Sequence, residues 1–356
     1  MGYEQQEFLF YEGEETDRDT SLGPDGEDAG GEAEQETVDP LSYDRVLVFF
    51  SGGKDSVACV LRLLDLGVPR DRIEVHHHLI DGREGSDLMD WPVTEAYCRA
   101  FANAFGLAYT ISWKQGGMER EMLRDNQPTA PTLIPVDGEM VQIGGDGPLG
   151  TRRKFPQTSA SLTTRWCSSY VKISVGAAYI VNHPKFLVGR TLVVTGERAE
   201  ESSARAKYKR FEPHRSDNRN GARVKRFVDH WRPVHLYSEK DVWTLIEKYR
   251  VAAHPAYWLG WGRTSCMLCI FGSCHQWASA NAIAPEKVRK VANYEREFKV
   301  TIHRKLSVDE QVARGVPYKM DPLHVARAMS TEYTESIIMD DWALPAGAYG
   351  ESCGPT

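Results

Sequence analysis

The stretch VLVFFSGGKDS at residues 46–56 decides the fold. Its first five residues form a short, continuous apolar run rich in β-branched and aromatic side chains, which is typical of a buried parallel strand. The run ends at residues 51–56, and apolar side chains then recur at helical spacing as far as Gly67, a residue type common at helix C-caps. The stretch therefore predicts a strand, a glycine loop and a helix in succession.

The alternation of strands and helices continues to about residue 250. We expect strands at 73–80, 107–113 and 191–195, and helices at 92–105, 167–181 and 238–249. Ser238 and Asp241 have the spacing of a capping box at the start of the last helix. Over about 41–250 this order predicts an α/β fold, a twisted and mainly parallel sheet with helices on both faces. We expect the active crevice at the carboxyl ends of the strands, where residues 51–56 and 196–205 converge.

Two segments interrupt the alternation. Residues 126–162 contain five prolines and no lasting period, so we expect an irregular active-site loop or a disordered insertion. Residues 205–226 contain nine Lys or Arg and only two acidic residues, with aromatic side chains between them. Such clustering suits the backbone and bases of a nucleic acid, and a solvated flexible loop is the alternative.

The two ends of the chain differ from its middle. Residues 1–40 carry a net charge of −13, which leaves +6 on the other 316 residues, and their composition predicts a disordered acidic tail. We expect a Cys-rich helical cap over 251–330 and a C-terminal tail over 331–356. The sequence shows neither a run of eighteen apolar residues nor a signal peptide, which predicts a cytoplasmic protein without membrane contacts.

The glycine loop has the properties of a phosphate site. A glycine-rich turn between a buried strand and a helix exposes backbone N–H groups, and the helix N-terminus adds positive potential. Lys54 adds a full charge, but the residue spacing differs from that of a Walker motif. The sequence SGGKDS at 51–56 instead resembles the PP-loop of ATP pyrophosphatases, which cleave ATP between its α- and β-phosphates. An ordinary tight turn is the structural alternative.

This resemblance implies a fold like that of the adenine nucleotide alpha-hydrolases, with ATP and Mg²⁺ bound at the loop. Lys54 would offset the charge that develops on the leaving pyrophosphate, and Asp55 would position the loop or Mg²⁺. The residues implied to hold the pyrophosphate are Ser51, Gly52, Gly53 and Ser56.

A second group of motifs narrows the resemblance. The sequence TGERAEES at 195–202, followed by Arg205, is similar to the Gly-x-Arg-x-x-Glu-Ser segment of the phosphoadenosine phosphosulfate (PAPS) reductase family. The sequences RWC at 165–167, WRP at 231–233 and DVW at 241–243 resemble the same family in the same order. The resemblance covers about residues 43–275. The residues it implies as contacts to a substrate phosphate or sulfate are Lys172, Gly196, Arg198, Ser202 and Arg205.

Three cysteines, Cys266, Cys269 and Cys274, fall within nine residues. A cytosolic chain does not favour a disulfide framework. In the iron–sulfur members of the resembled family an upstream cysteine before a helix completes such a group, which implies Cys167 as the fourth ligand. Four thiolates suit a [4Fe–4S] cluster or a structural Zn²⁺ ion, and the family resemblance favours the cluster. Buried thiols without a metal are the alternative.

Other sulfur and imidazole side chains suggest more limited roles. Cys59 and Cys98 lie among apolar residues at helical spacing and are predicted core residues. The three histidines at 76–78 end a strand, where alternate side chains point to opposite faces, so we expect structural or base-edge roles. Cys353 lies in a sequence faintly similar to the Glu-Cys-Gly tail of PAPS reductases, but Ser352 breaks that motif and no histidine follows.

The sequence thus predicts a PAPS reductase-like ATP pyrophosphatase that adenylates its substrate and lets a sulfur species displace AMP. Within the family the chain most resembles the branch that inserts sulfur during DNA phosphorothioation, which combines the same loop with an iron–sulfur cluster. The expected partners are an adenine nucleotide, a nucleic acid at 205–226, and a protein that donates sulfur or electrons.

Three other functions share parts of this pattern. A phosphoadenylyl-sulfate or adenylyl-sulfate reductase typically has a degenerate loop, so the intact Lys54 and Asp55 count against it. A sulfate adenylyltransferase subunit would leave the cysteines without a role. A non-catalytic zinc protein that binds nucleotides and nucleic acids would need no redox metal.

Overall fold

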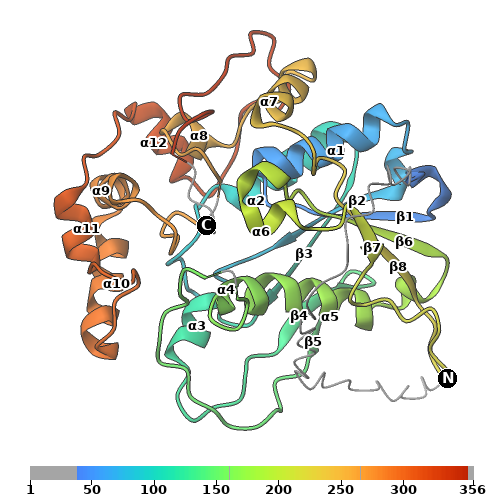
Figure 1. Ribbon diagram of the computed structural model, residues 1–356, viewed down its shortest axis with the longest axis horizontal. Helices are drawn as coiled ribbons and strands as arrows, with labels where there is room; N and C mark the ends of the chain where they lie inside the picture. The colour runs from blue at the N-terminus through green and yellow to red at the C-terminus, as the bar shows by residue number, and fades with distance from the viewer. Residues whose placement is uncertain (1–37, 160, 265, 352–356) are drawn as a thin grey trace, which may run out of the picture. The chain divides into compact units, whose positions relative to one another are not determined.

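The computed structural model describes residues 38–159, 161–264 and 266–351 (Figure 1). Within these residues the sheet has eight strands in the order β5-β4-β3-β2-β1-β6-β8-β7. Their bounds are β1 (Arg45–Phe49), β2 (Ile73–His78), β3 (Ala108–Lys114), β4 (Thr132–Val136), β5 (Glu139–Ile143), β6 (Arg190–Val194), β7 (Phe211–Pro213) and β8 (Phe227–Trp231). β3, β2, β1, β6 and β8 are parallel, and β4, β5 and β7 are antiparallel to their neighbours. The predicted mainly parallel sheet is confirmed.

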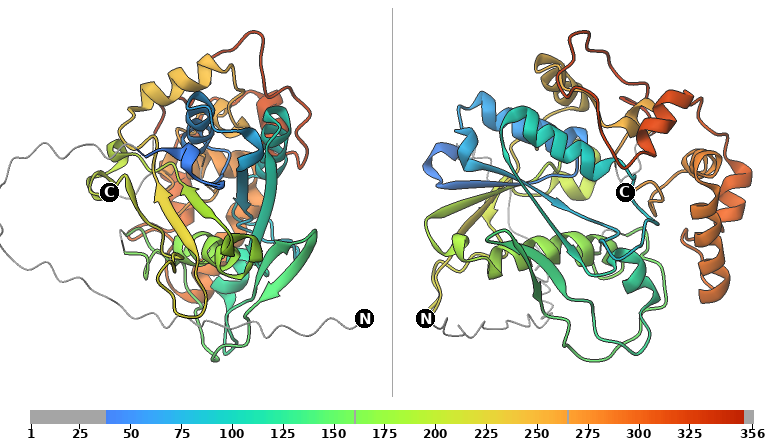
Figure 2. Two further views of the ribbon diagram at one scale, coloured as in Figure 1. Left: turned by 90° about the vertical axis from the view of Figure 1, so that its right-hand side faces the viewer. Right: turned by 180° about the vertical axis from the view of Figure 1, so that it is seen from behind.

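Helices cover both faces of this sheet. Figures 1 and 2 show α1, α2 and α7 on one face, α5 on the other, and α9, α10 and α11 beside the sheet. The α-helices are α1 (Lys54–Asp65), α2 (Thr94–Phe105), α3 (Gly117–Leu123), α4 (Trp166–Ser168), α5 (Ser174–Asn182), α6 (Ser203–Ala206), α7 (Glu239–Lys248), α8 (Pro255–Trp258), α9 (Cys274–Ile283), α10 (Pro285–Phe298), α11 (Val308–Arg314) and α12 (Pro322–Ala328). Short 3₁₀ helices occupy η1 (Pro40–Ser42), η2 (Arg70–Arg72), η4 (Pro184–Leu187) and η5 (Ala199–Glu201), and η3 (Ser169–Ile173) is a π-helical turn.

Local sequence explains the elements that were predicted correctly. Val46, Leu47 and Val48 of β1 are buried, because α1 and α5 cover the two faces of this central strand. α2 ends at Gly106, whose φ of 64° is the left-handed conformation that C-caps require. α7 begins with the predicted capping box, in which the Ser238 hydroxyl accepts a hydrogen bond from the Asp241 N–H at 3.2 Å. Capping residues and apolar periodicity thus fix these elements.

The segment at 126–162 is more regular than predicted. It contains the hairpin β4–β5, which extends the sheet beyond β3. The two residues of the turn, Asp137 and Gly138, have φ values of 51° and 88°, as expected for the tight turn that an Asp-Gly pair favours. Pro135 argued against a strand in the sequence, because proline lacks an N–H. It lies beyond the two residues of β4 that pair with β3, where a missing N–H is tolerated.

The basic insertion at 205–226 is also partly ordered into a strand. β7 pairs antiparallel with β8, and the Arg219 guanidinium forms ion pairs with Asp217 and Asp229. Arg226 is buried and its Nε donates to the Ser216 carbonyl oxygen at 2.8 Å. Five basic side chains of the segment are exposed, namely Lys207, Lys209, Arg215, Arg223 and Lys225. We call these five residues the basic surface.

The helix predicted at 167–181 is interrupted. The chain forms α4, then the π-helical turn η3, and then α5, which packs against the sheet through Gly176. A Cβ atom on Gly176 would lie 2.5 Å from the Phe49 ring, so only glycine allows this close approach. A π turn contains one more residue than an α-helical turn. The side chains before α5 therefore face a different direction from the one that an unbroken helix would give them.

Several predicted core positions are confirmed. Cys59 and Cys98 are fully buried. His76 hydrogen-bonds to Thr110 and Ser112 on one face of the sheet, whereas His77 bonds to the Phe50 carbonyl oxygen on the other. The orientation of neighbouring histidines thus alternates as predicted.

From Asp39 onward the chain forms one compact unit, which contains both domain boundaries predicted after η1. The boundaries at 250 and 330 stay predictions. The acidic tail, apart from residues 38–40, and Cys353 lie outside the described residues. Over the part of the chain that is described, no helix is long and apolar enough to cross a membrane. The cytoplasmic location also stays a prediction.

Candidate nucleotide site

The loop at 51–56 joins the carboxyl end of β1 to the first turn of α1. Gly52 has a φ of 75°, and Gly53 is the N-cap of α1. The Ser56 hydroxyl donates to the Gly53 carbonyl oxygen at 2.9 Å and accepts from the Ser51 N–H at 3.3 Å. These bonds close the loop on itself. Among the described residues the N–H groups of Asp55 and Ser56 have no acceptor, so the helix N-terminus remains open to an anion.

The second predicted motif meets this loop at the end of β6, the strand beside β1. Gly196 packs directly on the loop, since a Cβ atom there would lie 2.8 Å from the Asp55 carbonyl carbon. Arg198 Nε donates to Asp55 Oδ1 at 2.6 Å, and its side chain is nearly buried. The structure therefore brings together residues that are more than 140 positions apart. This convergence was predicted from the rule that α/β sheets bind ligands at the carboxyl ends of their strands.

Charge pairs control the ionisation of the loop. Burial by itself would raise the pKa of Asp55, but the positive charges of Lys54 and Arg198 outweigh it and hold the pKa below its ordinary value. Burial would likewise lower the pKa of Lys54, but the negative charges of Asp55 and Glu239 contribute to a net rise. Both groups are therefore charged at neutral pH.

The other predicted phosphate contacts are divided between two places. Arg205 forms an ion pair with Glu201, and the Ser202 hydroxyl accepts from the Arg205 N–H at 3.2 Å as the N-cap of α6. Lys172 lies instead near His78 and the cysteines. Its charge adds to burial in lowering the pKa of His78 and opposes burial at Cys266. The predicted set is thus not a single cluster.

Several residues around the loop were missed by the sequence analysis. Lys54 Nζ lies 3.2 Å from Glu239 Oε1 of α7 and donates to the Gly262 carbonyl oxygen at 3.0 Å. The Lys54 N–H donates to the Tyr257 hydroxyl at 3.0 Å. No local motif marks these partners, because tertiary packing alone brings them to the loop from about 200 residues away.

A ring of polar side chains continues from Glu197 away from the loop. The Thr195 hydroxyl bonds to Glu197 and to His230 Nε2, and Arg232 lies 3.4 Å from Glu197 and 2.7 Å from Glu212. Burial and the charge of Arg232 lower the pKa of His230 to about 4, so the imidazole is neutral at neutral pH. The ring links the segment that holds Asp55 to β7 of the basic insertion.

The predicted four-cysteine centre is not assembled. Across 38–159, 161–264 and 266–351, no three His, Cys, Asp or Glu side chains lie close enough together to hold a metal ion. Cys167 and Cys266 each lie near Cys269, but burial, with a contribution from Cys269, raises the pKa of both thiols. The described side chains therefore do not by themselves form a metal-binding group, and the four-cysteine ligand set stays a prediction.

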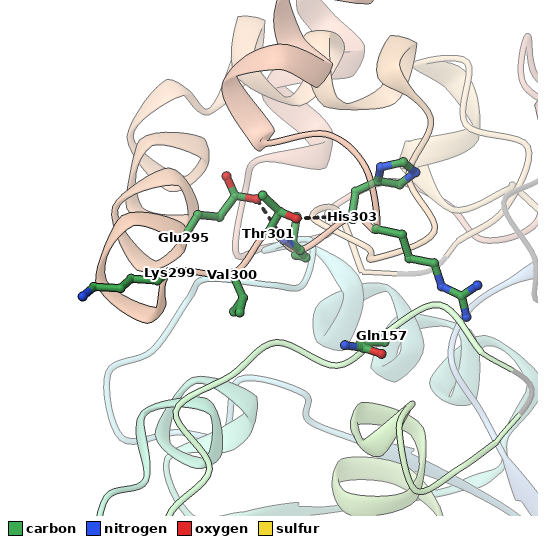
Figure 3. Close-up of a pocket in the computed structure, with 8 residues that line it drawn as sticks. Gln157, Glu295, Lys299, Val300, Thr301 and His303 are labelled. Carbon is green, nitrogen blue, oxygen red and sulfur yellow. Dashed lines mark hydrogen bonds between the residues drawn. The ribbon is translucent and has the colours of Figure 1, made fainter.

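A surface pocket of about 430 Å³ lies elsewhere, between residue 157 and the loop after α10 (Figure 3). Its buried carboxylate, Glu295, is already occupied, since it accepts the N–H groups of Ile302 and Val308 at 2.9 and 2.8 Å. None of the predicted site residues lines this pocket. We therefore place the candidate site at the loop, where the glycine turn, the helix N-terminus and the buried cations coincide.

Comparisons with known proteins give limited similarity. No protein-family model matches the chain. A protein of Escherichia phage 186, described as an uncharacterized 37.8 kDa protein in the gpa 5′ region, is 26% identical over 267 residues. These residues cover 70% of this chain and 74% of the phage protein.

Crystal structures of the FMN adenylyltransferase of Candida glabrata are also similar. The complex with FMN and the ATP analogue AMPCPP has 11% identity and a TM-score of 0.31, covering 64% of this chain and 56% of that one. The complex with FAD and inorganic pyrophosphate has 11% identity and a TM-score of 0.32, covering 87% and 82%. The chain thus spans little more than half of the first of these structures. TM-scores this low carry no argument about activity, and these similarities do not assign the chain to a family.

Proposed function

We propose that this protein is an ATP pyrophosphatase of the PP-loop type that activates a substrate by adenylation. The observation that carries the proposal is the meeting of the loop at 51–56 with Gly196 and Arg198, through the 2.6 Å contact between Arg198 and Asp55. A glycine turn at the carboxyl end of a central parallel strand, beside the end of the next strand, is where α/β sheets bind ligands.

The geometry suits cleavage between the α- and β-phosphates. An acceptor oxygen attacks the α-phosphorus, the bond to the bridging oxygen breaks, and pyrophosphate leaves with the negative charge. The open N–H groups of Asp55 and Ser56 and the ammonium of Lys54 would stabilise that charge. Lys54 would exchange Glu239 for a phosphate oxygen. The Mg²⁺ that accompanies ATP would enter as part of the substrate, and Asp55, the carboxylate of the loop, would help to hold it.

Release of pyrophosphate tests this proposal. We expect wild-type protein to release labelled pyrophosphate from γ-labelled ATP when a suitable acceptor is present. Lys54→Ala should slow the release by about 10²-fold or more, because a preorganised charge is lost from the leaving group. Lys240→Ala, which removes an exposed lysine of the same charge on α7, is the matched control. If Lys54→Ala keeps its native circular dichroism and full turnover, the loop is not the catalytic site.

We further propose that the acceptor is a nucleic acid and that the activated group is exchanged for sulfur. The exposed basic surface at 207–225 supports a polyanionic partner, and the polar ring from Glu212 to Glu197 connects it to the nucleotide site. No step of the proposed reaction is assigned to a metal cluster. Sulfite release from a phosphosulfate nucleotide, without pyrophosphate release from ATP under any condition, would favour the reductase instead.

A further inference from the structure

Residues 257–264, which precede the cysteine region, lie against the loop of the candidate nucleotide site. The Tyr257 hydroxyl accepts from the Lys54 N–H at 3.0 Å and from the Thr264 N–H at 3.3 Å, so a single hydroxyl joins this segment to the first residue of α1. Gly262 contributes its carbonyl oxygen to Lys54 Nζ. Two hydrogen bonds to Lys54 therefore fix residues 257–264 against the loop, and the bond between Thr264 and Tyr257 closes the segment on itself.

Thr264 lies against the loop glycine that a phosphate would approach. A Cβ atom on Gly53 would be 3.5 Å from both the Cβ and the carbonyl oxygen of Thr264. The Thr264 hydroxyl is buried, and no described residue serves as its hydrogen-bond partner. A buried hydroxyl that is left unpaired costs stability, and a ligand oxygen held beside Gly53 would pair with it.

Arg263 adds positive charge at the same place. Its Nη2 lies 3.5 Å from Glu201 Oε1, while Glu201 Oε2 bonds to Arg205. One carboxylate is therefore shared by two guanidinium groups. Arg263 is also near enough for its charge to oppose the net rise in the pKa of Lys54 and to add to the lowering of the pKa of Asp55, although other groups dominate both values. A guanidinium fork suits the oxygens of a phosphate group.

We propose that Arg263 and Thr264 bind the pyrophosphate end of the nucleotide from the side opposite the loop. Arg263 would pair with a terminal phosphate in place of its share of Glu201, and the Thr264 hydroxyl would donate to a phosphate oxygen held at Gly53. The site is then two-sided, with one wall from β1–α1 and the other from the segment just before Cys266. This inference rests on the proposed function, since it requires a nucleotide at the loop.

Calorimetric titration with inorganic pyrophosphate, ATP and AMP tests the second wall. Thr264→Val keeps the shape of the side chain but removes the donor, and Arg263→Gln removes the charge. Each should weaken the binding of pyrophosphate and ATP by about tenfold and leave the binding of AMP unchanged. Thr264→Ser keeps the hydroxyl and should bind as the wild type does. Thr331→Val and Arg314→Gln change exposed residues of the same types and serve as controls.

The outcomes separate this inference from the proposed function. If wild-type protein binds neither pyrophosphate nor ATP, the proposed function fails and the inference fails with it. If Lys54→Ala weakens binding but Thr264→Val and Arg263→Gln bind as the wild type does, the loop assignment stands and the second wall is wrong. If Thr264→Val does not fold, the test rests on two other variants. Arg263→Gln should still bind pyrophosphate about tenfold more weakly, and Thr264→Ser should bind it as the wild type does.

Discussion

Ion pairs neutralise the cations of the candidate nucleotide site. Lys54 faces Glu239, Arg198 faces Asp55, and Arg205 faces Glu201. A triphosphate would have to replace these carboxylates, so its affinity depends on the difference between two sets of ion pairs. The count of basic residues in the motif therefore overstates the attraction that the site offers to an anion.

Asp81, in the loop between β2 and α2, should make the stability of the protein depend on pH. Its carboxylate is buried and accepts the N–H groups of Met89 and Asp90 at 2.9 and 2.8 Å. Burial raises its pKa from 3.8 to about 6, and the nearby charge of Asp90 adds to this rise. The folded state thus binds the proton more tightly than the unfolded state does, and the free energy of unfolding falls as the pH rises from about 4 to 6.

Asp81→Asn should abolish this contribution, which is at most about 3 kcal/mol for a shift of this size. We expect the midpoint of thermal unfolding to change less between pH 4 and pH 6.5 in the variant than in the wild type. The measurement is circular dichroism at a series of pH values, with Asp341→Asn as the exposed control. Equal pH dependence in wild type and Asp81→Asn would mean that another group sets the slope.

At the scale of elements, the close contact between the ends of β1 and β6 builds the site. Gly196 follows β6 and touches the backbone of Asp55 at the start of α1. In Gly196→Ala, a methyl group 2.8 Å from a carbonyl carbon would force the backbone of the loop to move. We expect ATP binding to weaken more than tenfold, with a loss of about 1–3 kcal/mol in the free energy of unfolding.

Gly106→Ala is the matched substitution, because Gly106 ends α2 with a positive φ and nothing lies within 4 Å of a Cβ atom there. It should cost about 1 kcal/mol of stability and leave ATP binding unchanged. Isothermal titration with ATP and thermal unfolding distinguish the two effects. Unchanged affinity in Gly196→Ala would show that the contact with Asp55 does not shape the site.

The elements also show what local sequence could predict. β1, the loop and α1 follow from a continuous apolar run, two glycines and helical periodicity, all within about twenty residues. The hairpin β4–β5 was missed although its Asp-Gly turn was visible, because Pro135 and the surrounding glycines suggested an irregular loop. The signal was present, but a proline excludes a strand only where its missing N–H would have paired. The sequence alone does not show where the pairing with β3 ends.

The site itself could be predicted only in part. Gly196 and Arg198 were expected at the loop because adjacent parallel strands end at the same edge of a sheet. Tyr257, Gly262 and Glu239 could not be expected there, because a hydroxyl, a carbonyl oxygen and a carboxylate are brought to Lys54 by tertiary packing. The cysteine spacing suggested a metal centre, yet spacing along the chain does not determine how thiols meet in space.

At the scale of the whole molecule, the basic surface lies on the insertion that follows the segment from Gly196 to Arg205. A polyanion bound there would make contacts that depend strongly on salt. Changing Lys207, Lys209 and Lys225 together to glutamine should lower the slope of log affinity against log salt concentration by about 2–3, one unit or slightly less for each lost phosphate contact.

Fluorescence anisotropy with labelled single-stranded and duplex DNA at several salt concentrations measures this slope. The control changes Arg289, Arg314 and Lys319 to glutamine, which removes the same charge from exposed positions on and near α10 and α11. The same slope in both triple variants would assign the binding to net charge rather than to the basic surface.

Trp243 has a practical consequence for studies of this protein. Its buried ring lies 5.2 Å from the Tyr257 ring at 83°, and the Tyr257 hydroxyl contacts the first residue of α1. A ligand that displaces this hydroxyl must therefore disturb the surroundings of an indole. The chain has nine tryptophans, so the part of the change in intrinsic emission on ligand binding that Trp243→Phe abolishes should report occupancy of the loop without any attached dye.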